Sequence, residues 1–126
     1  MHGFVRIGAI LAMIAVILGA FGAHALKAKL NPDMLEIYKT GAQYHLIHAL
    51  GLILIGVIAE RNPVPRGAVW AGCLLVAGII LFSGSLYLLS TTGIKAFGAI
   101  TPLGGVAFIS GWGCLAFSAK GVGCRV

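Results

Sequence analysis

Four long apolar runs, separated by short polar segments, constrain this chain more than any other feature of its sequence. The runs cover about residues 7–26, 43–59, 68–89 and 97–118. A helix needs about 20 residues, each rising 1.5 Å, to cross a hydrocarbon core about 30 Å thick. The sequence therefore predicts an all-α integral membrane protein that crosses the bilayer four times.

The composition supports a membrane environment. Of the 126 residues, 60% are hydrophobic and only 10% are charged, whereas soluble domains are about 25% charged. A soluble domain this small could not bury so much apolar surface. We expect residues 1–126 to form a single transmembrane domain, a four-helix bundle. The first run also has the A-x-A-like end of a signal peptide, Ala23-His24-Ala25, but its length favours a span.

A polar stretch follows the first run and contains a helix start. Asn31 is a suitable N-cap, Pro32 suits the first helical position, and Asp33 favours the positive end of the helix dipole. The apolar side chains that come next share one helical face. We expect a short amphipathic helix over about residues 32–40, lying in the membrane interface between the first two spans.

The charge balance indicates membrane anchoring. Nine Lys and Arg residues stand against three acids, which gives a net charge of +6. The basic residues stand singly between apolar runs, which excludes a nucleic-acid-binding face and is typical of headgroup anchors.

The basic residues also bear on orientation. Five fall on the side of both termini: Arg6, Arg61, Arg66, Lys120 and Arg125. Four fall on the other side: Lys27, Lys29, Lys39 and Lys95. The small excess favours cytoplasmic termini, and a dual-topology protein would show a similar balance.

Small residues recur on two of the predicted helices. Ala15, Gly19 and Ala23 recur every four residues on the first run. On the fourth run Gly105 and Gly113 share one stripe, and Ala107 and Gly111 share another. Small residues allow close approach between membrane helices. We expect these stripes to form packing contacts inside the bundle.

Polar side chains gather in one leaflet when the chain is threaded through four antiparallel spans. The ends of the first and third runs and the starts of the second and fourth lie on the same side. The candidate polar cluster comprises His24, Gln43, Tyr44, His45, His48, Ser83, Ser85, Tyr87 and Thr101. Ionisable residues inside a membrane are costly and suggest function.

Three interpretations of this cluster remain open. The histidines are neutral and hydrogen-bond neighbouring helices, or they handle protons with Tyr and Ser as relays. Alternatively, His24, His45 and His48 bind a metal or haem. No acidic residue lies inside a span to assist proton transfer, and the chain has no phosphate loop, Gly-x-Ser-x-Gly elbow or zinc-protease motif. We therefore expect neither an enzyme nor a bound cofactor.

Four motifs in order resemble a known family. They are GAFGAHAL (19–26), YHLIHAL (44–50), FSGSLY (82–87) and ITPLGG (100–105). The chain resembles the membrane family called domain of unknown function 423, which includes YgdD- and YwdK-like bacterial proteins and eukaryotic transmembrane protein 256. The resemblance implies a small multi-pass protein of the bacterial plasma membrane. It brings no established activity, so no site residue is carried over.

These observations lead to one expectation and two alternatives. The leading expectation is a non-enzymatic accessory or packing component in contact with lipid, associating with a second copy or another membrane protein. The first alternative is a small transporter or channel that uses the polar cluster. The second is a His-ligated metal or haem protein.

Overall fold

The structure is a computed structural model that describes residues 2–60 and 64–118. In chain order its elements are α1 (His2–Phe21), η1 (Gly22–Leu26), α2 (Pro32–Ile58), α3 (Arg66–Gly78), η2 (Ile79–Ser83), α4 (Gly84–Thr92), η3 (Lys95–Ala99) and α5 (Thr101–Ser118). Both η1 and η2 are π-helical turns, η1 at the end of the first helical rod and η2 inside the third, and η3 is a short 3₁₀ turn. Three of the basic residues counted above for orientation, Arg61, Lys120 and Arg125, lie outside the described residues.

The four-span, all-α fold is confirmed within the described residues. Four helical rods are long and apolar enough to cross a membrane: Gly3–Leu26, Pro32–Ile58, Arg66–Thr92 and Lys95–Ser118. The two π turns do not interrupt their rods, so α1 runs directly into η1, and α3, η2 and α4 form one continuous span.

The predicted interfacial helix is instead the beginning of the second span. The start is as expected, because the Asn31 side chain caps the helix by accepting a 2.8 Å hydrogen bond from the Met34 backbone N–H. The prediction of a separate helix over 32–40 was wrong, since α2 continues unbroken to Ile58. The polar stretch stays helical because Tyr38 and Gly41 are buried against neighbouring helices, and tertiary packing carries most helix stability.

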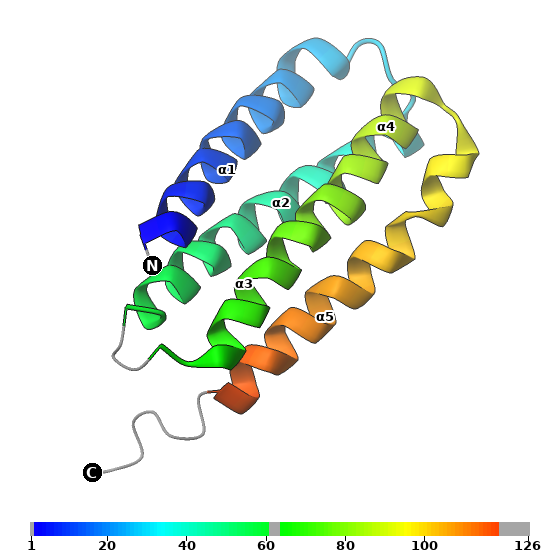
Figure 1. Cartoon of the computed structure of the whole chain (residues 1–126). Coiled ribbons are helices and arrows are strands. Elements are labelled where there is room, and N and C mark those ends of the chain that lie inside the picture. The colour runs from blue at the N-terminus through cyan, green and yellow to red at the C-terminus, as the bar shows by residue number, and fades with distance from the viewer. Residues whose placement is uncertain (1, 61–63, 119–126) are drawn as a thin grey trace.

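The rods pack side by side, with α1 and α5 on the outside (Figure 1). The α1 helix packs along α2, α5 packs along α3 and η2, and α2 contacts both α3 and α4. In its most apolar window the first span is 11% buried, against 44% for the α2 span. The outer helices therefore present most of their apolar surface to lipid.

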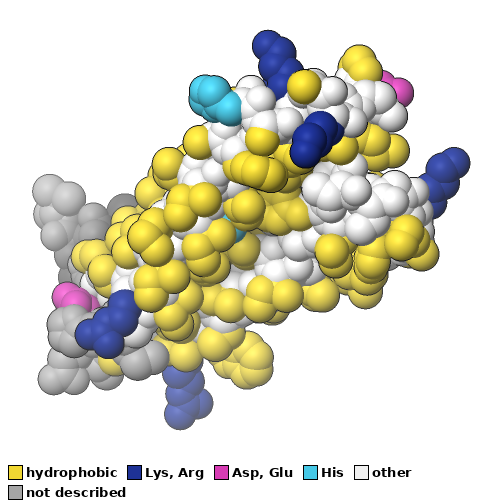
Figure 2. Space-filling view, turned by 90° about the horizontal axis from the view of Figure 1, so that it is seen from above, with side chains coloured by type: hydrophobic (Ala, Val, Ile, Leu, Met, Phe, Trp, Pro, Cys, Tyr) yellow, Lys and Arg dark blue, Asp and Glu magenta, His cyan; other side chains and the backbone are white. Residues whose placement is uncertain are grey.

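The core and the surface follow from this arrangement. The buried apolar cluster draws on every span and consists of Phe4, Leu52, Ile55, Ala68, Ala71, Leu75, Ile79 and Phe108. On the face shown in Figure 2, hydrophobic side chains cover the band between the helix ends, and Lys and Arg side chains lie towards the ends. That distribution is the one expected of a bilayer-spanning bundle.

The tightest crossings of α5 use Gly111, which belongs to a predicted stripe, and Gly104, which does not. A Cβ atom on Gly104 would overlap the backbone of Phe82, and one on Gly111 would lie 2.9 Å from Leu75 Cδ2. By contrast, a Cβ on Gly19 or Gly113 would meet nothing within 4 Å.

The prediction of internal contacts was wrong for Gly19, Ala23 and Gly113, since a Cβ on either glycine would meet no described atom within 4 Å and Ala23 is exposed. The rotation of α5 turns Gly111 of the second predicted stripe inward, as expected, and leaves Gly105 at the edge of the contact, where a Cβ would lie 3.9 Å from Phe82 Cδ2. On the first span, Ala15 of the predicted stripe is 3% exposed and does pack inside the bundle.

Candidate functional site

His45 and Tyr87 form the main polar contact between the second and third spans. His45 is 3% exposed, and its Nδ1 shares a 2.9 Å hydrogen bond with the Tyr87 hydroxyl. The Tyr87 ring packs 5.3 Å from the ring of Tyr38. The Tyr38 hydroxyl in turn donates a hydrogen bond to the backbone carbonyl of Leu18 on α1. Two hydrogen bonds and one ring contact therefore join α1, α2 and α4.

The second ring nitrogen of His45 has a different environment. Its Nε2 is buried and has no partner of hydrogen-bonding geometry within the described residues. The backbone of Leu11 on α1 also lies against His45. His45 therefore lies between α1 and α4. Its Nδ1 has a hydrogen-bond partner, and its Nε2 has none among the described residues.

His48 lies one helical turn further along and faces the fourth span. Its Nδ1 lies 2.7 Å from the carbonyl oxygen of Tyr44, so this nitrogen carries the hydrogen, because a carbonyl only accepts. The imidazole stacks on Phe108 with ring centroids 3.6 Å apart and an interplanar angle of 12°. Trp112 packs against it with a centroid separation of 5.7 Å. His48 is thus part of an aromatic stack between α2 and α5.

Ser85 and Thr101 join the third and fourth spans. Ser85 Oγ donates to the carbonyl of Phe82 at 2.8 Å, and the two hydroxyl oxygens are 2.6 Å apart. Since the single Ser85 hydroxyl hydrogen is already used, Thr101 is the donor in this pair. Ser85 therefore connects the end of η2 and the start of α5 through its two hydrogen bonds.

The predicted cluster thus divides into three separate contact sets, and some of its members belong to none of them. His24 is exposed, and its Nδ1 contacts the carbonyl of Ala20 at 2.9 Å within its own helix. Gln43 is exposed as well. Ser83 is fully buried, but its hydroxyl has no hydrogen-bond partner in the described part of the chain.

The predicted metal-binding set does not form. Among the described residues no group of three His, Cys, Asp or Glu side chains is placed to hold a metal ion. His24 faces outward from the end of the first span, while His45 and His48 have different neighbours. The interpretation of His24, His45 and His48 as a shared ligand set was therefore wrong.

Sequence reasoning missed several residues of the polar region. Tyr38 was placed on an interfacial helix, although its position shortly before the YHLIHAL motif could have placed it in the second span. Phe108 and Trp112 carry the stack on His48, and no polar signal in the sequence marks them.

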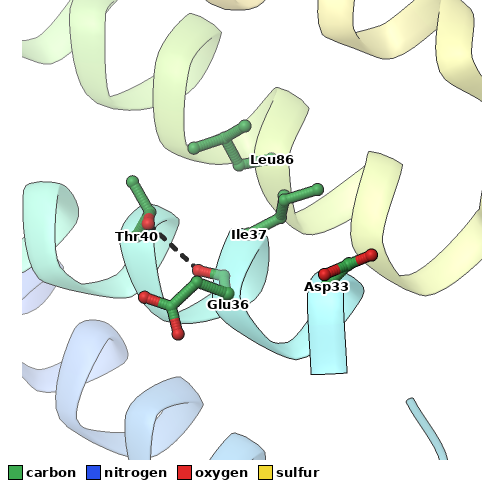
Figure 3. Close-up of a pocket in the computed structure, with 5 residues that line it drawn as sticks. All are labelled: Asp33, Glu36, Ile37, Thr40 and Leu86. Carbon is green, nitrogen blue, oxygen red and sulfur yellow. Dashed lines mark hydrogen bonds between the residues drawn. The ribbon is translucent and has the colours of Figure 1, made fainter. Parts of the chain in front are cut away.

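An open groove lies at the start of α2, apart from the histidines. It has a volume of about 350 Å³ and is lined by Asp33, Glu36, Ile37, Thr40 and Leu86. Figure 3 shows the groove between α2, which carries Asp33, Glu36, Ile37 and Thr40, and Leu86 on α4. The Thr40 hydroxyl donates to the Glu36 carbonyl. None of the histidines lines this groove.

Comparison with known proteins places these motifs in a family. The family described as "Protein of unknown function (DUF423)" matches residues 18–105. The UPF0382 membrane protein YwdK of Bacillus subtilis (strain 168) is 53% identical over 112 residues, which is 89% of this chain and 91% of that protein.

Staphylococcal proteins are similarly close. The UPF0382 membrane protein SH2409 of Staphylococcus haemolyticus is 46% identical and covers 86% of this chain and 88% of its own length. SAB0533 of Staphylococcus aureus is 49% identical with the same coverage. No solved structure matches the chain.

Proposed function

Because this chain belongs to the DUF423 family of membrane proteins, we propose that it acts without catalysis, as an accessory component of the bacterial plasma membrane that packs against another membrane segment. Its termini lie in the cytoplasm in this proposal. The observation that carries the proposal is the set of glycines on the outer faces of its helices.

Glycines inside the bundle are explained by the fold itself. Gly8, Gly51, Gly104 and Gly111 each lie so close to a neighbouring helix that a Cβ atom would come within 3 Å of it. A Cβ would meet backbone atoms at Gly8 and Gly104 and side-chain atoms at Gly51 and Gly111, so packing within one copy accounts for these glycines.

Glycines on the outside have no such explanation within one copy. A Cβ on Gly19, Gly84 or Gly113 would meet nothing within 4 Å. Glycine lowers helix stability relative to alanine, so an open position in a helix favours a larger residue unless something else approaches. A membrane helix from a second protein uses small residues of this kind for close contact.

The buried polar groups support an internal structural role. Tyr38, Tyr87, Ser85 and Thr101 each bond across a helix interface, and His48 is stacked against α5. Such contacts hold membrane helices at fixed rotations. The polar groups then set the orientation in which the outer glycines are presented.

A bulky side chain on the outer face tests this proposal. In Gly113→Ile the fold should be retained, because the position is open, and association should be lost. The control is Ile109→Leu, a near-isosteric change one turn earlier on the same exposed face. Chemical crosslinking in membranes and the particle size in mild detergent report association. A protein that is monomeric and crosslinks to no membrane protein contradicts the proposal.

A second candidate is passage of protons or a small solute, which the His45–Tyr87 contact favours. Histidine and tyrosine are both capable of relaying protons, and the contact lies inside the spans. Sealed vesicles containing the purified protein should then show flux that His45→Phe abolishes and His24→Phe leaves unchanged. Absence of proton or solute flux between about pH 5 and 8, the range in which histidine titrates, excludes this candidate.

A further inference from the structure

Two buried polar atoms of the described chain have no hydrogen-bond partner, His45 Nε2 and Ser83 Oγ. Their residues are 3% and 0% exposed. Buried polar atoms in proteins are almost always satisfied by a protein group or a bound water, because leaving them unpaired is costly. Each of these two atoms therefore requires an explanation.

Ser83 differs from the other buried serines of the spans. The hydroxyls of Ser85 and Ser90 donate to a carbonyl three residues earlier in their own helix. Ser83 is the last residue of η2, where the next N–H, that of Gly84, donates five residues back to Ile79, and its hydroxyl has no such bond among the described residues. The Ser83 hydroxyl is therefore available for a partner outside its helix, and π turns are frequent at functional sites.

Ser83 and His45 belong to the same helix interface. A Cβ on Gly41, one turn before His45 on α2, would lie 3.4 Å from the Ser83 carbonyl oxygen. Tyr87, one turn after Ser83 on the third span, contacts His45 directly. Residues one turn apart lie on the same helical face. The α2-facing side of η2 and α4 therefore brings the two unpartnered residues towards each other.

We propose that a water molecule binds between His45 and Ser83 and bridges the second and third spans. Water both donates and accepts, so it satisfies the hydroxyl and either tautomer of the imidazole. Buried waters make two to four such bonds, and the backbone of Leu11, which interacts with His45, supplies a further acceptor. The inference does not depend on the proposed function, because a bridging water serves packing and proton transfer alike.

Solid-state NMR of the protein in bilayers, with its histidines ¹⁵N-labelled, tests the water directly. Magnetisation should pass from water to the His45 imidazole in the unmodified protein. The signal should fall severalfold in Ser83→Ala and persist in Ser90→Ala. Ser90 is the matched control, because it is also buried and its hydroxyl bonds only to its own helix. No transfer in the unmodified protein, or an unchanged signal in Ser83→Ala, overturns the proposal.

The direction of the stability change gives a second, independent readout. Loss of a bridged hydroxyl should raise the unfolding equilibrium constant of Ser83→Ala about tenfold. If the hydroxyl has no partner at all, its removal relieves an unsatisfied group and the constant falls or stays the same. The Ser90→Ala variant gives the effect of removing a buried serine hydroxyl that bonds to a carbonyl of its own helix.

Discussion

Adding one methyl group to each of two adjacent glycines in α5 should have opposite effects on stability. A Cβ on Gly104 would overlap the backbone nitrogen, Cα and Cβ of Phe82, whereas a Cβ on Gly105 would lie 3.9 Å from the nearest atom, Phe82 Cδ2. Phe82 lies within the π turn η2 and cannot move away without displacing the third span. The Gly104→Ala change therefore requires the two helices to separate, and the Gly105→Ala change does not.

The magnitudes follow from these contacts. Overpacking against a rigid neighbour costs about 1–3 kcal/mol, and backbone overlap places Gly104→Ala at or above the upper part of that range. Gly105→Ala should gain up to about 1 kcal/mol, because alanine favours the helix more than glycine does. The free energies of unfolding of the two variants should therefore differ by about 3 kcal/mol or more.

Reversible unfolding in mixed micelles, followed by circular dichroism, measures both changes in the same assay. The Gly104→Ala variant should unfold at a lower denaturant fraction than the unmodified protein, and Gly105→Ala at an equal or higher one. Equal losses in the two variants, or a larger loss at Gly105, would refute the rotation of α5 that places Gly104 against the third span.

Further predictions concern the individual polar contacts. Tyr87→Phe removes the partner of Nδ1 of buried His45 and should lower the free energy of unfolding by about 1–3 kcal/mol. Tyr44→Phe, at a ring that is 40% exposed, should change it little, and similar losses in the same micelle assay would contradict the His45–Tyr87 contact. Ser85→Ala removes the acceptor of the Thr101 hydroxyl and should lower the free energy of unfolding by about 1 kcal/mol. An unchanged free energy of unfolding would contradict the hydrogen bond between α4 and α5. Asn31→Ala removes the cap of α2 and should cost about 1 kcal/mol, with faster amide exchange confined to the first turn; unchanged exchange would exclude the cap.

The sequence predicts position along the membrane normal better than rotation about a helix axis. Apolar run length located the four spans, and Asn31 with Pro32 located the start of α2, because length and capping are local properties. The same local signals did not reveal how far that helix continues. Nothing local distinguishes a separate interfacial helix over 32–40 from the first turns of a longer span, since the burial of Tyr38 depends on contacts with α1 and α4.

Rotation decided which members of the predicted cluster meet. His45 and His48 are three residues apart, a spacing that puts two side chains near one helical face, yet the first contacts Tyr87 and the second stacks on Phe108. A separation of about 60° between such positions is enough to direct them to different neighbours. The π turns add further rotation, and His24, which lies within η1, points outward. No periodicity in the sequence reveals a π turn.

Photo-crosslinking from the outer face of α5 tests the central claim of association most directly. A photoreactive residue in place of Gly113, activated in native membranes, should form a discrete adduct with a protein, either a second copy or another membrane protein. The same residue in place of Ile109, on the same exposed face, serves as the comparison. Adducts with lipid alone at Gly113, equal to those at Ile109, would contradict the account.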